Sequence, residues 1–446
     1  MSETWNHVAC PGCSCLCDDL SVQFDGDRLL SFEPACPRGE QWFRTRCESS
    51  PRGPQVAGVT VDYDSAIAVA VEILRAADYP LIYGLSQSAT PGQRAAIALA
   101  DALSGVADTT ASLDHSAAIM ALQEFGEVTC TLGEIRNRAD LVIFWGCDPA
   151  SSHPRHAERY SIHPRGRWLP GGRDDRTVVM IGTAGQVEQC RLDAEGTTPD
   201  ITIAIQPGQD FETLSLLRRL VRGDHVADVP APLGQLVPLM KGCKYGAFFY
   251  GLGLGSGDDS ESSAAAPIDH VNVAALLQLV AELNAFARIT ARRMGRHGEV
   301  SGADNVLCWQ TGYPFAVDFS CGYPRHNPSE FSADGLLARG DVDAAVLVGA
   351  ETIPRFSAAA RKHLESIPTI LLDHPAAQLP FQSTVEFSTA VYGLHASGTT
   401  FRMDNVPLAL HAMVPTKLPT DADVLTDLMN GLAIEAGIGS RRDPRR

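Results

Sequence analysis

Short apolar runs alternate with amphipathic stretches along most of the chain. The fully apolar runs, each ending near a Gly or Asp loop, fall at residues 81–84, 141–145, 178–181, 247–250, 344–348 and 369–372. Between them, apolar residues recur at helical spacing, as Ile67, Val71 and Leu74 do within residues 62–77. Apolar strands that alternate with helices indicate parallel sheets covered on both faces. Ligands of such folds bind beyond the carboxyl ends of the strands.

A second helix is predicted to begin at Thr90-Pro91 and to run to about Leu103, with Thr90 as the N-cap and Pro91 in the first turn. Residues 1–52 differ from the rest, because they are rich in Cys, Pro and Gly and show little helical period. They indicate a small, loop-rich unit held by metal. Residues 253–267 and 441–446 are expected to be a surface loop and a disordered tail.

Composition and charge narrow the function classes. The chain has 446 residues, 45% of them hydrophobic and 20% charged, which is typical of a globular protein with more than one domain. A net charge of -17 argues against nucleic acid as the primary partner, since that requires clustered Lys and Arg. The sequence shows no leader peptide and no apolar stretch long enough for a membrane span, so we expect a cytoplasmic protein without a membrane partner.

The cysteines point to a metal site at the amino terminus. Of twelve cysteines, six lie in the first 47 residues. Cys10, Cys13 and Cys17 form a compact run, and Cys36 follows before Pro37. This spacing predicts a 4Fe-4S cluster with three ligands from one loop and a fourth from a distant segment. Zinc is the alternative, although zinc ribbons usually have two Cys-x2-Cys pairs. Two further cysteines, Cys15 and Cys47, are interpreted as packing thiols.

Three further segments carry a family resemblance. Residues 137–160 contain Trp-Gly-Cys-Asp-Pro and His-Pro-Arg-His, residues 309–325 begin Trp-Gln-Thr-Gly-Tyr-Pro, and residues 398–404 read Gly-Thr-Thr-Phe-Arg-Met-Asp. Together with the cysteines, they resemble the B subunit of formylmethanofuran dehydrogenase over nearly the whole chain. That family belongs to the molybdopterin oxidoreductases, and its bacterial members are part of a formyltransferase/hydrolase complex in tetrahydromethanopterin-linked one-carbon metabolism.

The resemblance implies a fold and its domains. We expect an α/β protein with an iron–sulfur domain at 1–52 and two parallel-sheet domains of molybdopterin oxidoreductase type. One would comprise 53–115 with 295–385 and the other 116–294, while 386–446 would be a closing segment and tail. The barrel domain of the wider family would be absent, and A, C and D subunits are the expected partners.

The resemblance also implies a molybdopterin guanine dinucleotide site with Mo or W. Arg155 and Arg159 are suited to phosphate, and Gly146 permits close approach of the backbone. The alternative is that this polar loop is merely solvated, and an ordinary turn is an equal alternative at Asp373. The residues expected at the cofactor are Gly146, Cys147, Asp148, His153, Arg155, His156, Arg159, Gly349, Glu351, Asp373, Arg402 and Asp404.

One position departs from the family pattern. The family holds its metal with a cysteine directly followed by a histidine, and here Asp114 stands before His115. A carboxylate is a harder ligand than a thiolate, although some nitrate reductases of the wider family use aspartate. Cys130 is the nearest other thiol and is expected to be a buried core residue. A family arginine near the metal corresponds to Arg296, with the neighbouring Gly-Arg order inverted.

Three hypotheses follow. In the first, the chain is part of a formyltransferase/hydrolase complex that handles a formyl carrier and formate, and it acts as a scaffold without redox chemistry of its own. In the second, it is an active Mo or W oxidoreductase of the formylmethanofuran or formate dehydrogenase type, with Asp114 as ligand and electrons passing through the cysteine cluster. In the third, it is a zinc-stabilised α/β binding protein.

Overall fold

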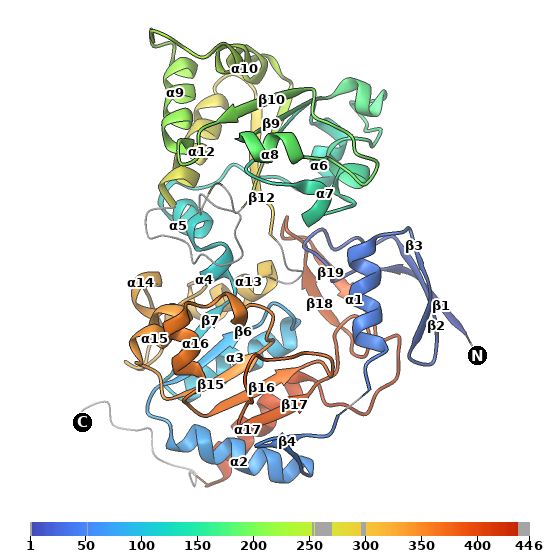
Figure 1. The fold of residues 1–446 in the computed structure, drawn as a ribbon, viewed down its shortest axis with the longest axis vertical. Coiled ribbons are helices and arrows are strands. Elements are labelled where there is room, and N and C mark those ends of the chain that lie inside the picture. The colour runs from blue at the N-terminus through green and yellow to red at the C-terminus, as the bar shows by residue number, and fades with distance from the viewer. Residues whose placement is uncertain (1, 51, 252–253, 255–269, 296–299, 436–446) are drawn as a thin grey trace. The chain divides into compact units, whose positions relative to one another are not determined.

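The computed structural model of the chain describes residues 2–50, 52–251, 254, 270–295 and 300–435. The chain forms two compact units (Figure 1). Unit 1 comprises Met1–Leu113, His297–Arg402 and Pro407–Arg446, and unit 2 comprises Asp114–Arg296 and Met403–Val406. Unit 2 is therefore mostly an insertion between two parts of unit 1. The predicted residues 253–267, 296 and 441–446 lie wholly or almost wholly outside the described residues.

The amino-terminal part of unit 1 is more regular than the sequence indicated. Three antiparallel strands, β1 (Glu3–Val8), β2 (Leu20–Asp25) and β3 (Arg28–Glu33), form one sheet, and α1 (Pro37–Cys47) follows it. The prediction of a loop-rich segment was wrong here. Its short strands and single helix share one small core, which includes the cysteines, so no long apolar period marks them in the sequence.

A nine-stranded sheet forms the centre of unit 1. Its order is β14-β13-β7-β6-β15-β16-β17-β4-β5, and the strands from β7 to β17 are parallel. The antiparallel edges are β13 and β14 on one side and β4 and β5 on the other. The bounds are β4 (Gln55–Val56), β5 (Val59–Thr60), β6 (Pro80–Gly84), β7 (Val106–Thr109), β13 (Val317–Asp318), β14 (Arg325–His326), β15 (Ala344–Val348), β16 (Thr369–Asp373) and β17 (Val385–Ser388).

Helices cover both faces of this sheet, as the alternation of strand side chains requires. Ile82 and Val346 pack with α2, α3, α13 and α17, whereas Tyr83 and Leu347 pack with α15 and α16. The bounds are α2 (Tyr63–Ala76), α3 (Thr90–Ala102), α13 (Val300–Thr311), α14 (Pro328–Phe331), α15 (Ala333–Arg339), η3 (Ile353–Arg355), α16 (Ala358–Leu364) and α17 (Asp421–Glu435). A hairpin of β18 (Gly398–Phe401) and β19 (Pro407–Leu410) completes the unit.

Unit 2 contains a second, wholly parallel sheet. Its five strands run in the order β10-β9-β8-β11-β12. One face packs on α5, α9, α10 and α12, and the other on α6 and η1. The bounds are β8 (Leu141–Trp145), β9 (Thr177–Thr183), β10 (Ile201–Ile205), β11 (Tyr245–Tyr250), β12 (Arg288–Arg293), α5 (Ser116–Phe125), α6 (Leu132–Arg138), α7 (Pro149–Ser152), η1 (Ala157–Ser161), η2 (Gly172–Asp175), α8 (Ala184–Gln189), α9 (Asp210–Arg222), α10 (Ala231–Gly242) and α12 (His270–Leu283). The short helix α4 (Ala111–Asp114) begins in unit 1 and ends on the first residue of unit 2.

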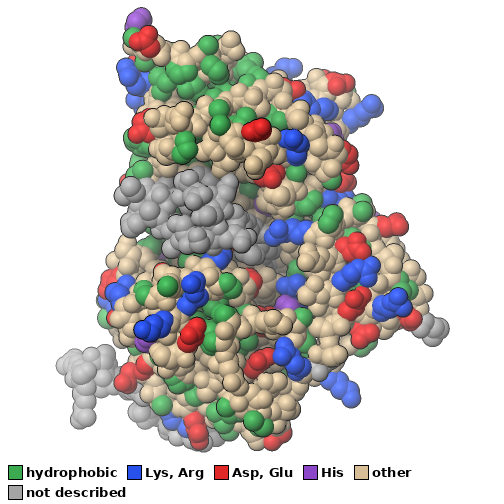
Figure 2. Space-filling view, viewed as in Figure 1, with side chains coloured by type: hydrophobic (Ala, Val, Ile, Leu, Met, Phe, Trp, Pro, Cys, Tyr) green, Lys and Arg blue, Asp and Glu red, His purple; other side chains and the backbone are tan. Residues whose placement is uncertain are grey.

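The predicted class of a mixed α/β fold with parallel sheets is confirmed. The detail of the predicted α3 start was wrong: Ala89 is the N-cap, and Thr90 is already helical. The Thr90 hydroxyl donates to the Thr399 carbonyl (3.1 Å) instead of capping the helix. No helix of the described ranges is long and apolar enough to cross a membrane. Acidic and basic side chains are interspersed over the face of the protein shown in Figure 2.

Candidate functional site

The four cysteines of the predicted cluster come from two segments of unit 1. Cys10, Cys13 and Cys17 lie on the loop between β1 and β2, which is closed by a hydrogen bond from the Cys10 N–H to the Cys17 carbonyl (2.9 Å). Cys36 is the N-cap of α1 and precedes Pro37 in its first turn. All four side chains are buried in one small core. The fold thus brings the distant fourth cysteine to the loop that carries the other three.

The charges of these thiols influence one another. Burial raises the pKa of Cys10 well above its usual range, and Cys13, Cys17 and Cys36 raise it further. If all four of these buried thiols were ionised, they would require a compensating positive charge, which a cationic metal centre would supply. In the described parts of the chain, no three His, Cys, Asp or Glu side chains are arranged as ligands of a single metal ion.

Glycine backbone packs closely around the Cys10 sulfur. A Cβ on Gly12 would lie 3.3 Å from the Cys10 Sγ, and one on Gly39 would lie 3.0 Å from it and 2.7 Å from the Phe32 ring. Arg38 ties the two segments together by donating from Nε to the Gly12 carbonyl (2.9 Å). The residues that flank the four cysteines therefore fix the shape of this core.

In unit 2, the predicted Gly146–Asp148 loop follows β8 at the point where the strand order reverses. Sheets of this topology bind ligands at that point. The Gly146 φ angle is +56°, which favours glycine. A Cβ on Gly251, just after β11, would lie 2.5 Å from the Gly146 oxygen and 2.6 Å from the Cys147 Cβ. The exposed Asp148 caps α7 through a hydrogen bond from Ser151 N (3.4 Å).

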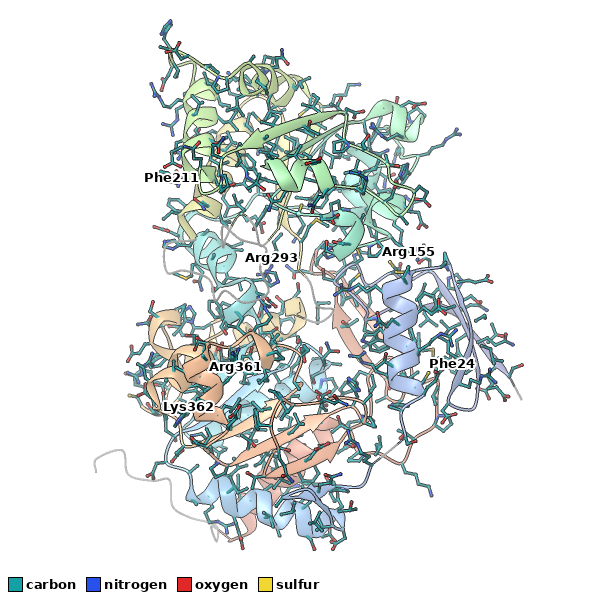
Figure 3. All side chains as sticks on the ribbon, in the orientation of Figure 1. Phe24, Arg155, Phe211, Arg293, Arg361 and Lys362 are labelled. Atoms are coloured by element: carbon teal, nitrogen blue, oxygen red, sulfur yellow. The ribbon has the colours of Figure 1, made fainter. Side chains whose placement is uncertain are left out.

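The polar side chains that come after this loop in the sequence differ in the groups that they contact. Nδ1 of His156 lies 2.9 Å from Ser161 Oγ, and its ring meets Phe249 edge-on at 4.5 Å. Burial, and then the charge of His153, lowers the pKa of His156 to about 3, so this ring is neutral. Arg155, labelled in Figure 3, donates twice to the Glu158 carboxylate (3.0 and 2.8 Å). The structure therefore gives the predicted phosphate ligand Arg155 an acidic partner.

Arg159 lies differently from Arg155. Its guanidinium carbon is 5.2 Å from the centre of the Tyr160 ring, in a cation–π arrangement. It is partly exposed, whereas His153 and His156 are completely buried. The cluster is thus brought together as predicted, and its role at a dinucleotide stays a prediction.

A second polar group lies at the carboxyl edge of the unit 1 sheet. Asp373 accepts from the N–H groups of Ala350 (2.8 Å) and His374 (2.7 Å). Burial, followed by the charge of Glu351, raises the pKa of Asp373 to about 7. Gly349 adopts a φ angle of +95°, and a Cβ there would lie 2.7 Å from a Glu351 oxygen. The predicted Gly349, Glu351 and Asp373 do lie together.

Sequence reasoning missed three residues of this group. Arg46 of α1 donates to Gln87 Oε1 (3.1 Å), and its charge interacts with Asp373 and Glu351. Ser86 donates to the Glu351 carboxylate. Arg46, Gln87, Gly349 and Asp373 line a common cavity with residues of the loops after β16 and β17. No sequence signal links these residues, because their contacts join segments far apart in the chain.

Asp114 and His115 lie at the junction of two short helices. Asp114 ends α4, and His115 is the N-cap of α5, where its carbonyl accepts from the Ile119 N–H (3.0 Å). Both side chains are buried. The third predicted catalytic residue, Arg296, lies outside the described residues.

Arg402 and Asp404 are both buried near the end of β18. One Asp404 oxygen accepts from the N–H of Leu132 (2.7 Å) at the start of α6. A carboxylate there also interacts favourably with the helix dipole. Asp404 therefore has a structural partner, and its predicted cofactor role stays a prediction.

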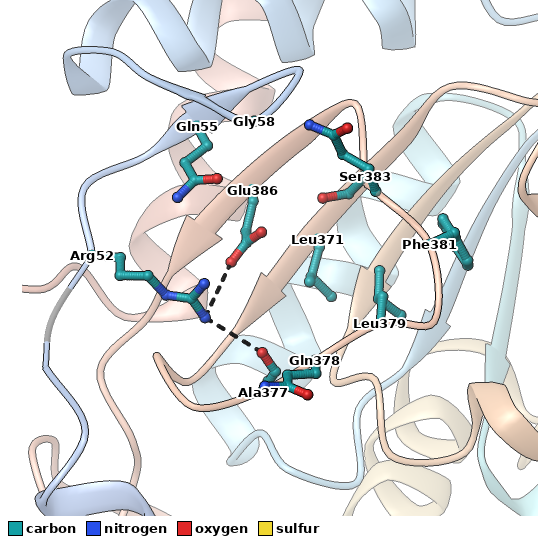
Figure 4. Close-up of a pocket in the computed structure, with 11 residues that line it drawn as sticks. Arg52, Gln55, Gly58, Leu371, Ala377, Gln378, Leu379, Phe381, Ser383 and Glu386 are labelled. Atoms are coloured by element: carbon teal, nitrogen blue, oxygen red, sulfur yellow. Dashed lines mark hydrogen bonds and ion pairs between the residues drawn. The ribbon is translucent and has the colours of Figure 1, made fainter.

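A further pocket of about 220 Å³ lies over β16, β17 and the β4–β5 hairpin of unit 1 (Figure 4). Arg52 donates to the Pro375 carbonyl (2.5 Å), and its Nη2 lies 3.7 Å from Glu386 Oε1. Glutamine amides supply much of the remaining polar lining. The sequence had not indicated this pocket.

The geometry defines a class of protein: an α/β chain with one parallel sheet and one mixed sheet whose central strands are parallel, polar groups at the carboxyl edges of both, and a buried four-cysteine core. A scan against models of protein families finds no match. Relatives, however, match along nearly the whole length. The chain is 33% identical over 445 residues to the B subunit of the tungsten-containing formylmethanofuran dehydrogenase 2 of Methanocaldococcus jannaschii, covering 96% of this chain and 98% of that protein. The chain belongs to the family of formylmethanofuran dehydrogenase B subunits.

Two further comparisons extend this relation. The corresponding protein of Methanococcus maripaludis is 31% identical over 442 residues, with 96% and 98% coverage. The B subunit of the formyltransferase/hydrolase complex of Methylorubrum extorquens is 25% identical over 300 residues, which covers 67% of this chain and 75% of that one. A crystal structure of that complex with methylofuran contains a similar fold (TM-score 0.70, 23% identity), covering 87% of this chain and all of the matched chain.

Proposed function

We propose that the chain is the B subunit of a complex that converts a carrier-bound formyl group to formate in tetrahydromethanopterin-linked one-carbon metabolism. Its family membership supports this, because its relatives are named as components of formylmethanofuran dehydrogenases and of a formyltransferase/hydrolase complex. The partners in this proposal are A, C and D subunits, and the complex is cytoplasmic. Within it, the chain is a scaffold without redox chemistry of its own.

The observation that carries the scaffold role is the buried carboxylate of Asp114 beside His115. The family position calls for a thiolate, which is the soft ligand that suits Mo and W, and a carboxylate does not fit that requirement. Cys130 is a poor replacement for the missing thiolate. Its sulfur lies 3.4 Å from Thr290 Oγ1, and burial raises the pKa of its thiol, which disfavours the thiolate.

A second candidate is an active Mo or W oxidoreductase with Asp114 as ligand. The retained core of Cys10, Cys13, Cys17 and Cys36 favours it, because a pure scaffold has no need of an electron relay. A 4Fe-4S cluster bound there would supply one-electron transfer. The near-complete alignment with two tungsten-containing enzymes points in the same direction.

Elemental analysis of the chain purified with its partner subunits separates the two candidates. The scaffold proposal predicts iron without stoichiometric molybdenum or tungsten. One Mo or W per chain would overturn it in favour of the oxidoreductase. Zinc in place of iron would overturn the cluster assignment and leave the scaffold proposal standing.

Replacement of the carboxylate gives an independent test. In the scaffold proposal, Asp114→Asn leaves formate production by the assembled complex unchanged, as does the control Asp224→Asn at an exposed position after α9. A loss of at least tenfold in Asp114→Asn alone, with the complex intact by size-exclusion chromatography, would establish a catalytic role for Asp114.

A further inference from the structure

The pocket shown in Figure 4 lies on one face of the unit 1 sheet, beside the part that α15 and α16 cover. Leu371 of β16, Glu386 of β17 and Gln55 of β4 are paired in register, so their side chains share one face of the sheet. Leu371 belongs to the core that packs on α15 and α16. All three residues line the pocket, and the loop between β16 and β17 supplies most of the remaining lining.

This loop is tied down at both ends. Where it leads into β17, the Thr369 N–H donates to Thr384 Oγ1 (3.1 Å), and the Thr384 N–H donates to Thr369 Oγ1 (3.3 Å). Near its start, Nη2 of Arg52 donates to the carbonyls of Pro375 (2.5 Å) and Ala377 (3.4 Å). The pocket is therefore built by hydrogen bonds between segments that are far apart in the sequence.

Several polar groups of the lining make no hydrogen bond with the described residues. The Ser383 hydroxyl is one of them, although Ser383 is only 7% exposed, and it points inward in Figure 4. The side-chain amides of Gln55, Gln378 and Gln382 are likewise without a partner in the described parts of the chain. Each amide offers both donors and an acceptor. Since buried polar groups are normally hydrogen-bonded, this lining favours a ligand that supplies the partners.

Two charged residues, Arg52 and Glu386, face each other across the pocket without a hydrogen bond. Arg52 Nη2 lies 3.7 Å from Glu386 Oε1, and the Glu386 side chain is 24% exposed (Figure 4). The contacts of Arg52 with described residues all involve Nη2, which leaves Nε and Nη1 for a ligand. The two charges cancel, so the pocket suits a ligand without net charge. A ligand with one anionic and one cationic group can hydrogen-bond to both residues.

The size and the apolar lining of the pocket limit the ligand further. Its volume of about 220 Å³ is far above the roughly 10–15 Å³ that one water molecule needs, and below the roughly 300–1,000 Å³ of sites for larger ligands. Leu371, Leu379 and Phe381 make part of the wall apolar. A molecule with a few carbon atoms and polar groups at both ends fits these limits.

We propose that this pocket binds a free α-amino acid whose side chain ends in an amide, as that of L-glutamine does. Arg52 and Ser383 donate to its carboxylate, and Glu386 accepts from its ammonium group. The carbon atoms of the ligand side chain lie against Leu371, and its amide pairs with the glutamine amides of the lining. The site does not rest on the proposed function of the complex.

Isothermal titration calorimetry of the full chain, purified with its partner subunits, tests the proposal with L-glutamine. Saturable binding is expected at concentrations of about 10 mM or below. Glutaramic acid lacks the ammonium group and 4-aminobutanamide lacks the carboxylate, so each is expected to bind at least tenfold more weakly. Absence of L-glutamine binding would overturn the proposal. So would equal binding of either analogue, or tighter binding of uracil, a neutral lactam without charged groups.

Glu386→Gln separates recognition of the ligand from a structural effect, because it keeps the side-chain size and removes the charge that receives the ammonium group. L-glutamine is expected to bind this variant at least tenfold more weakly, while glutaramic acid binds as it does to the wild type. The preference for L-glutamine is then lost, which general loosening of the fold does not produce. Glu365→Gln, at an exposed position after α16, is the matched control and keeps the wild-type preference. An unchanged preference in Glu386→Gln would overturn the proposal.

Ser383→Ala tests the carboxylate end without removing an anchor of the loop. L-glutamine is expected to bind this variant several-fold more weakly, whereas binding of 4-aminobutanamide, which has no carboxylate, is unchanged. Wild-type affinity of Ser383→Ala for L-glutamine, or an equal loss for both compounds, would overturn the proposed orientation of the ligand.

Discussion

Asp318 is expected to be a main structural anchor of residues 309–325, the segment that carries the most distinctive part of the family resemblance. Its carboxylate is completely buried and accepts two hydrogen bonds from Arg325 (2.9 and 2.5 Å) and one from the Tyr79 hydroxyl (2.8 Å). It also accepts from the Ser320 hydroxyl (3.0 Å). Asp318→Ala removes the acceptor for all of these donors at once.

The expected cost follows from these contacts. Breaking a buried ion pair by removing one partner costs about 3–5 kcal/mol. Since the Arg325 side chain is 36% exposed and can rehydrate, the lower end applies, and we expect a loss of about 3 kcal/mol. For a unit of this size, that corresponds to a fall in melting temperature of about 8 °C.

Differential scanning calorimetry of the full chain measures this change. The matched control is Asp341→Ala, which removes another Asp–Arg pair of unit 1 (Arg339 Nε to Asp341 Oδ2, 2.7 Å) in which both side chains are 43% exposed. A pair so exposed contributes about 0–1 kcal/mol. If Asp318→Ala lowers the melting temperature no more than this control does, the reasoning from burial is refuted. Asp318→Asn, which keeps the side-chain volume, should give an intermediate value.

Three further predictions concern other parts of the molecule. Burial raises the pKa of Asp108 to about 7, so between pH 4 and 7 the folded chain keeps a proton that the unfolded chain has lost, and stability falls as pH rises. In Asp108→Asn the decline of melting temperature over this range should therefore be less steep; an unchanged slope would contradict the assignment. Gly251→Ala places a Cβ 2.5 Å from a backbone oxygen and should cost about 2 kcal/mol in urea unfolding, whereas Gly185→Ala meets nothing within 4 Å and should be neutral. Cys36→Ser should lower the iron content and visible absorbance of the complex, while the exposed Cys321→Ser should not, and equal iron in both would argue against the cluster.

The sequence predicted those strands best that are buried on both faces. The bounds of β8 and β15 coincide with the predicted apolar runs, because each of their residues is buried. Strand β10 was not predicted, since it lies at the edge of its sheet and alternates in exposure. Strand β12 was not predicted either, because Arg292 and Arg293 make it look polar, and only the structure shows that the Arg292 side chain bonds to backbone carbonyls.

The candidate sites also contain some residues that sequence alone can group and others that only the fold brings together. The spacing of Cys10, Cys13 and Cys17 is local, so sequence alone could group them. The contribution of Arg46 at the edge of the unit 1 sheet depends on Gln87, Glu351 and Asp373, which come from separate loops. Such groupings arise from tertiary packing and have no periodic signal in the sequence.

The insertion of unit 2 into unit 1 has a consequence for the order of folding during synthesis. In unit 1, the central strand β6 needs β15 as its neighbour, and Pro80 pairs with Ala344. Strand β15 leaves the ribosome only after the whole inserted part of unit 2 has been made. The five strands of unit 2, by contrast, come from one uninterrupted stretch of the chain. We therefore expect the inserted unit to fold first, while the earlier half of unit 1, with its apolar β6 and β7, remains exposed until translation is nearly complete.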